Sequence, residues 1–173
     1  MNVASMPLDT VGFAQRQIDI TSRHARVAKA VIRLSPLWLL KLRTLSTAKL
    51  GTYKLKIDAI MFRGLAANVA DHRANGGWSK IDGAGRQAID GLTLLATTMH
   101  DLHGQILSLK TKSPMIHAAI SDFAAAASEV YDSITGLRWE FLELEASRSR
   151  IDTGYAASTA EEVDEVFARI VSE

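Results

Sequence analysis

Two successive runs of apolar residues between positions 81 and 144 most strongly limit what this chain can fold into. In each run, apolar or small residues recur at alternating spacings of four and three, which is typical of the contact seam between helices that pack side by side. Ser113-Pro114 separates the runs, and such a pair suits the start of a new helix. We therefore predict a long antiparallel, coiled-coil-like hairpin with helices over about 78–110 and 114–150. The seam residues are Ile81, Gly85, Ala88, Leu92, Leu95, Met99, Leu102, Ile106 and Leu109 in the first run, and Ile116, Ile120, Phe123, Ala127, Val130, Ile134, Leu137, Phe141 and Leu144 in the second.

The pairing of the two hairpin helices follows from where the chain turns. If the turn lies near Thr111, Ile89 faces Tyr131 along one flank, and His103 faces His117. The other flank consists mostly of small residues, which let another helix approach closely. We expect the N-terminal helices to lie on that flank.

The remaining helices are predicted from apolar periodicity and from residues that end helices. We expect helices over about 10–34, 36–50 and 52–74, with Gly51 between the last two and Asn75-Gly76-Gly77 as a loop. One side of the first helix carries an apolar row made of Phe13, Ile20, Val27, Val31 and Leu34. The residues expected to point inward from the third helix are Ile57, Ile60, Met61, Leu65 and Val69. Asp152-Thr153-Gly154 predicts a break before a short C-terminal helix over 158–172. The expected fold is all-α, a single domain over 1–173 with basic helices over 10–74, the hairpin over 78–150 and about five or six helices in total.

Composition excludes several classes of protein. The chain has 173 residues and no cysteine, which excludes a disulfide scaffold and a thiol nucleophile. No phosphate-binding loop, nucleophile elbow or other catalytic signature is present, so we expect no catalytic residues, no cofactor and no enzymatic activity. The sequence begins without a secretory signal and has no apolar stretch long enough to span a membrane, so we expect a cytoplasmic protein.

Charge is distributed very unevenly along the chain. Residues 1–56 contain ten Lys and Arg against two Asp, a balance of +8, whereas residues 119–173 contain four Arg against twelve Asp and Glu, a balance of −8. The two ends either neutralise each other within the fold or form two binding surfaces of opposite charge. The basic helices could contact nucleic acid or an anionic membrane surface. The candidate contact residues are Arg16, Arg23, Arg26, Lys29, Arg33, Lys41 and Arg43.

Three histidines form a candidate metal site. His100 and His103 lie one helical turn apart, and the predicted pairing brings His117 beside His103. Neutral imidazoles clustered in this way can bind a transition metal. The alternative is that they are ordinary surface or helix-contact residues, or a contact that responds to pH.

An apolar cluster near the end of the hairpin needs a cover. Trp139 and Leu142 fall outside the predicted seam, next to Phe141, so this stretch is apolar on all sides. Either the C-terminal helix folds back over it, or another protein or a second copy of the chain covers it.

The sequence thus favours a non-enzymatic helical bundle that acts as a protein-interaction or regulatory module. We expect its partner to be another protein or a second copy of itself. Nucleic-acid binding through the basic helices is the alternative, and a histidine-dependent metal-binding bundle is a third interpretation.

Overall fold

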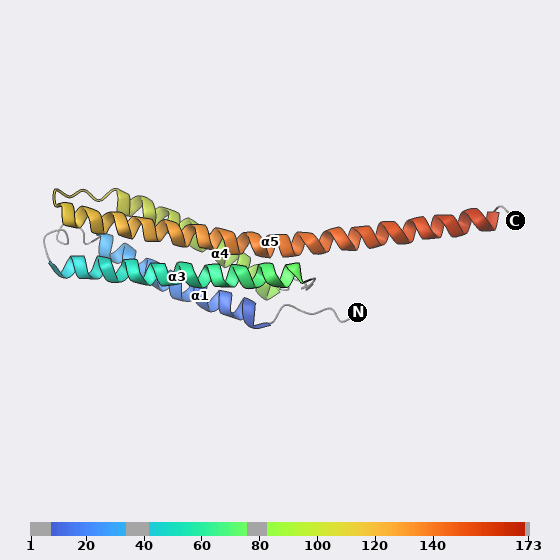
Figure 1. Cartoon of the computed structure of the whole chain (residues 1–173), viewed down its shortest axis with the longest axis horizontal. Helices are drawn as coiled ribbons and strands as arrows, with labels where there is room; N and C mark the ends of the chain where they lie inside the picture. Colours follow the sequence, from blue (N-terminus) through green and yellow to red (C-terminus); the bar gives the residue numbers. More distant parts are fainter. Residues whose placement is uncertain (1–7, 34–41, 76–82, 172–173) are drawn as a thin grey trace.

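The computed structural model is all-helical in the residues that it describes, 8–33, 42–75 and 83–171 (Figure 1). These residues form α1 (Leu8–Arg33), α3 (Leu42–Ala74), α4 (Gly83–Leu107) and α5 (Pro114–Val171). In α5, the structure describes side chains as far as Ala146. The predicted start of a helix near residue 36 lies outside the described residues, as do Gly76 and Gly77 of the predicted loop.

The four described helices pack as a bundle in which each helix has two main neighbours. α5 packs against α3 and α4, and α1 packs against the same two helices, so α1 and α5 lie diagonally across the bundle. α1 runs antiparallel to α3, and α4 runs antiparallel to α5 (Figure 1). None of the helices, over the residues described, is long and apolar enough to cross a membrane.

The seam residues predicted for α4 and α5 form most of the core. Leu92, Met99, Leu102, Leu137 and Phe141 have no solvent exposure. Burying one such side chain stabilises a fold by about 1.5–3 kcal/mol, so this pair of helices supplies a large share of the apolar burial. Leu109 and Ile116, on either side of the link between the two runs, are half-buried, and Ile81 lies outside the described residues.

The pairing of α4 with α5 differs from the predicted one by about one heptad. Tyr131 lies beside His100, with ring centroids 5.8 Å apart, instead of facing Ile89. The Nε atom of Arg138 donates a hydrogen bond to the Thr93 hydroxyl over 2.8 Å. The cause is the connection between the helices. α4 ends at Leu107, and residues 108–113 continue in the direction of α4, beside the first turns of α5, before the chain turns into α5 (Figure 1). An extended chain covers about 3.3 Å per residue against 1.5 Å in a helix, so the longer link lets α5 slide along α4.

Two predicted helix ends are also wrong. α3 continues through Gly51, where a Cβ atom would lie 3.1 Å from the Phe123 ring. That glycine serves close packing against α5 rather than helix termination. α5 continues through Asp152-Thr153-Gly154 to Val171. Asp, Thr and Gly lower helix propensity by about 1 kcal/mol or less each, and no proline follows to remove a helical hydrogen bond, so a helix can pass through them.

The small-residue flank of α4 and α5 holds the N-terminal helices, as the sequence predicts. A Cβ on Gly91 of α4 would lie 3.3 Å from Ile18 of α1. On α5, Glu140 accepts a 3.0 Å hydrogen bond from Arg73, near the end of α3. The absence of a side chain at Gly91 therefore lets α1 approach α4 closely.

Candidate functional site

Helix α1 buries several small and polar residues and exposes three of its large apolar ones, although Ile32 is buried and Ile18 packs against the core. Ala14, Thr21 and Ala25 have no exposure. Phe13 and Val27, by contrast, are 54% and 60% exposed. Of the apolar row predicted for this helix, Phe13, Ile20 and Val27 face solvent and Val31 is half-buried, while Leu34 lies outside the described residues.

Helix α3 has an apolar core side and a second apolar side that is exposed. Leu55, Phe62 and Val69 are buried, whereas Ile57, Ile60 and Met61 are 41–59% exposed. The expected inward orientation is therefore confirmed for Leu65 and Val69, which are buried, and is wrong for the other three residues. A helix with apolar residues on two sides gives no indication of which side its own chain covers.

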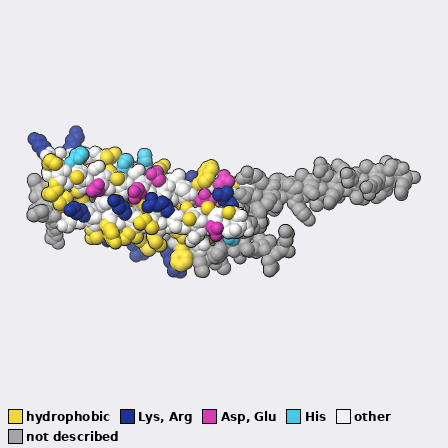
Figure 2. All heavy atoms as spheres, viewed as in Figure 1, with side chains coloured by type: hydrophobic (Ala, Val, Ile, Leu, Met, Phe, Trp, Pro, Cys, Tyr) yellow, Lys and Arg dark blue, Asp and Glu magenta, His cyan; other side chains and the backbone are white. Residues whose placement is uncertain are grey.

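The exposed rows of α1 and α3 belong to one surface, which we call the α1–α3 face. Figure 2 shows hydrophobic side chains gathered along the edge where these two helices lie, with Lys and Arg side chains beside them. Contiguous apolar patches are uncommon on proteins that act alone and are typical of interaction sites. The apolar residues of the face are Phe13, Ile20 and Val27 on α1, and Leu50, Tyr53, Ile57, Ile60 and Met61 on α3.

A small apolar cavity lies between the two helices at this face. Its volume is about 60 Å³, and Val27, Leu50 and Lys54 form part of its lining. These three residues are exposed, so the cavity is reached from the α1–α3 face, while Phe123 of α5 lies on its inner side. It has room for the end of one apolar side chain.

Positive charge surrounds the apolar rows. Arg16 lies over the ring of Phe13, with its guanidinium carbon 5.6 Å from the ring centroid. Arg23, Lys54 and Lys56 are exposed on the same two helices. The face therefore combines an apolar surface with cations, which suits a partner that is apolar and acidic.

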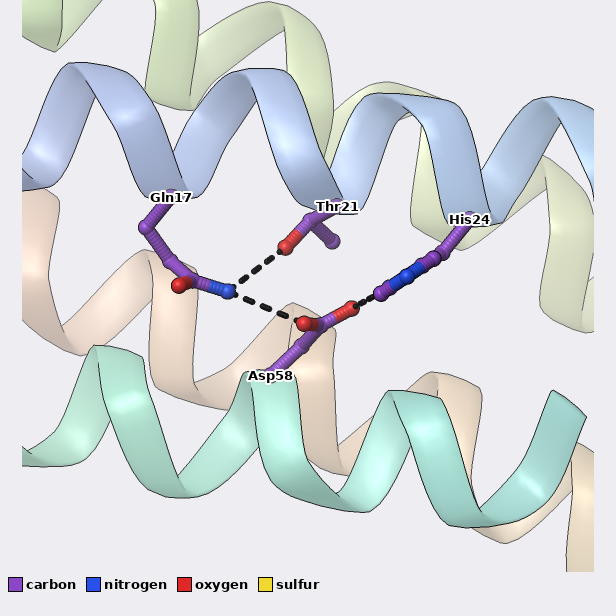
Figure 3. Close-up of polar contacts among 4 residues, drawn as sticks. All are labelled: Gln17, Thr21, His24 and Asp58. Carbon is purple, nitrogen blue, oxygen red and sulfur yellow. Dashed lines mark hydrogen bonds and ion pairs between the residues drawn. The ribbon is translucent and has the colours of Figure 1, made fainter. Parts of the chain in front are cut away.

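Beneath the face, four polar side chains join α1 to α3 (Figure 3). Asp58 of α3 is 1% exposed, and its Oδ1 accepts a 2.9 Å hydrogen bond from Nε2 of Gln17. The same Nε2 lies 3.2 Å from the hydroxyl of Thr21, and Nδ1 of His24 lies 2.7 Å from Oδ2 of Asp58. Both carboxylate oxygens therefore have a partner, as a buried acid requires.

This polar network fixes the position of α1 on α3. Sliding α1 by one turn would leave the Asp58 carboxylate buried without its donors, which costs about 1–3 kcal/mol or more. Sequence reasoning missed the network. The available signal was the spacing of Gln17, Thr21 and His24, which recur at four and three residues and so share one side of α1.

The structure does not bring the three predicted metal-binding histidines together. No group of three or more His, Asp or Glu side chains suited to a metal ion occurs in the part of the chain that the structure describes. His100 and His117 are exposed and His103 is half-buried. Because the pairing of α4 with α5 is shifted, His103 does not have His117 opposite it, and His100 contacts Tyr131 of α5.

The predicted aromatic patch divides between surface and core. Trp139 is 60% exposed and Leu142 is half-buried, but Phe141 is fully buried in the core and is not available to a partner. The C-terminal segment does not fold back over this patch as a separate helix, because it continues α5 in one direction (Figure 1).

Of the predicted basic contact residues, four arginines of α1 are exposed and Lys29 is half-buried. Ion pairs from α3 and α4 to the acidic helix α5 are made by Arg73 with Glu140 and by Arg86 with Glu145. The exposed arginines are Arg16, Arg23, Arg26 and Arg33, and the side chains of Lys41 and Arg43 lie outside the described residues.

Comparison with protein-family models, curated proteins and solved structures found no match for this chain.

Proposed function

We propose that this chain is a non-enzymatic protein-interaction module whose contact surface is the α1–α3 face. In this proposal the hairpin of α4 and α5 packs as a coiled-coil-like scaffold. The scaffold holds α1 and α3 in place, and these two helices present the surface that the partner recognises.

The observation that carries the proposal is the exposed row of large apolar residues on α1, which lies beside buried small and polar residues. A helix that needs only its own chain places Phe, Ile and Val inside and small polar residues outside. Here Phe13 and Val27 are exposed while Thr21 and Ala25 are completely buried. The stabilisation that those large side chains can supply becomes available only when another molecule covers them.

A protein partner suits this face better than nucleic acid does. Nucleic-acid surfaces are mainly contacted by charged and polar side chains, whereas the centre of the α1–α3 face is apolar. Protein interfaces commonly combine an apolar centre with a charged rim. Nucleic acid remains the alternative through the arginines of α1, and its signature is binding that weakens steeply with salt.

Affinity capture from the native host tests the proposal. The bait is the full chain, either unchanged or with Ile57→Asp and Met61→Asp together. Both side chains are exposed, so the variant should fold normally, as checked by circular dichroism. We expect the unchanged chain to retain its protein partner and the double variant to lose it.

The matched control is Leu94→Asp. Leu94 is 72% exposed on α4, away from the α1–α3 face, and its replacement should leave capture unchanged. Equal capture by all three baits would contradict the proposal. A bait with Trp139→Ala tests the second surface predicted from the sequence, since loss of the partner from that bait alone would move the contact to α5.

A further inference from the structure

Helix α5 continues well beyond the helices that cover it. Arg73, the second-last residue of α3, pairs with Glu140, and Arg86, in the first turn of α4, pairs with Glu145. α5 then continues to Val171 and extends past the ends of α1, α3 and α4 (Figure 1). Val171 is 31 residues beyond Glu140, which is about 46 Å along a helix. A helix without tertiary contacts is only marginally stable in water, so this length of helix calls for a partner.

The sequence of this part of α5 is acidic and has an apolar row of its own. Residues 151–171, which we call the α5 extension, contain five Asp and Glu and one Arg. Apolar residues recur at spacings of four and three within it, the pattern of a helix that packs along one side. They are Ala156, Ala160, Val163, Phe167 and Ile170.

The α5 extension and the α1–α3 face are complementary in charge and in apolar character. The face carries exposed cations, among them Arg23 and Lys54, beside exposed apolar rows. The extension of the same molecule points away from that face as part of one continuous helix (Figure 1). The α5 extension therefore cannot reach the α1–α3 face of its own molecule, and the face that it fits is that of another molecule.

We infer that the α5 extension of a second copy of this chain docks on the α1–α3 face, and that two copies do so reciprocally. This inference rests on the proposed function and names the partner. Reciprocal contacts of this kind form a closed two-fold dimer in which each contact is made twice.

Helix lengths agree with this arrangement. Met61 and Leu50 lie 13 and 24 residues before Ala74, the end of α3, which is about 20 and 36 Å from that end. In a dimer with the two bundles placed end to end, the C-terminal parts of the two α5 helices overlap. Each α5 then reaches about 46 Å beyond its Glu140, which is far enough to pass along the whole apolar row of the other copy's α3.

A charge exchange between two full-length variants tests the inference. One variant carries Arg23→Glu and Lys54→Glu on the face, and the other carries Glu161→Lys, Glu162→Lys and Glu165→Lys on the extension. Each variant alone places like charges at both contacts, so we expect its self-association to weaken by at least about tenfold. In the mixture both contacts again join opposite charges, and we expect the mixed dimer to form with close to the original affinity. Sedimentation equilibrium measures all three dissociation constants.

The control is Lys110→Glu with Lys112→Glu, the same change of charge on exposed residues at the link between α4 and α5. It should leave the dissociation constant of the unchanged chain unaltered. An unchanged chain that stays monomeric, or a mixture that associates no better than either variant, would overturn the inference. If dimerisation fails in this way but the Ile57→Asp, Met61→Asp bait loses another protein that the unchanged chain captures, the proposed function still holds. If that bait also captures the same proteins as the unchanged chain, the proposed function and the dimer inference are both wrong.

Discussion

The two antiparallel helix pairs of this bundle are built in opposite ways. Between α4 and α5 the interior is almost entirely apolar, with Leu92, Met99 and Phe141 fully buried. Between α1 and α3 the interior includes Gln17 and Asp58, while large apolar residues face solvent. The first arrangement stabilises the fold without any other molecule. The second gives up part of that stabilisation and leaves apolar surface available for binding.

The largest expected effect tests the apolar pair. Phe141→Ala should lower the free energy of unfolding by about 3–5 kcal/mol, because it removes a fully buried ring from a well-packed core. Chemical denaturation monitored by circular dichroism measures the change. A loss below 1 kcal/mol would mean that the α4–α5 interior is not the main source of stability.

The buried polar network is the next test. Asp58→Ala should cost about 2 kcal/mol, because the amide of Gln17 loses its acceptor inside the bundle. Asp58→Asn keeps an acceptor oxygen at the same place and should cost less. If the two variants are equally stable, the network does not hold α1 on α3.

Close packing of α3 on α5 can be tested at a glycine. Gly51→Leu should destabilise the protein by about 1–2 kcal/mol, because even a Cβ atom at this position would lie 3.1 Å from the Phe123 ring. Gly64→Ala on the same helix is the control. That glycine has no atom within 4 Å of an added Cβ, and alanine should stabilise the helix by up to about 1 kcal/mol.

The smallest expected effect concerns the α1–α3 face itself. Ile60→Ser should change the free energy of unfolding of the dilute protein by less than about 0.5 kcal/mol, because the side chain is 59% exposed. Thermal unfolding at low protein concentration provides the measurement. A loss comparable to that of Phe141→Ala would show that the face is part of the core, and the contrast between the two pairs would disappear.

The difference between the two interiors also explains why the buried side of α4 and α5 could be predicted from the sequence, whereas that of α1 could not. For α4 and α5, a single apolar row alternates with polar residues, so period alone identified the buried side. Their relative position depended on the link over 108–113, whose extended course has no periodic signal. The pairing was therefore predicted about one heptad away from its observed place.

For α1 and α3, the period predicted helices but not which side is buried. Phe13, Ile20 and Val27 align as a predicted contact row would, and nothing in their spacing distinguishes a row covered by the same chain from one covered by a partner. The side of α1 that is buried consists mostly of small and polar residues, and such residues give no signal of burial in the sequence. The candidate site was therefore recognisable only after burial was known.

The small-residue contacts of α1 have a consequence for how the molecule opens. α1 packs mainly against α3 and α4. Ala14, Thr21 and Ala25, its described residues with no exposure, are small, and each of them buries little apolar area. Its detachment from the rest of the bundle should therefore need less free energy than global unfolding. Backbone amides of α1 should then exchange with deuterium sooner than those in the middle of α5. A molecule that covers Phe13, Ile20 and Val27 should slow that exchange along the whole length of the helix.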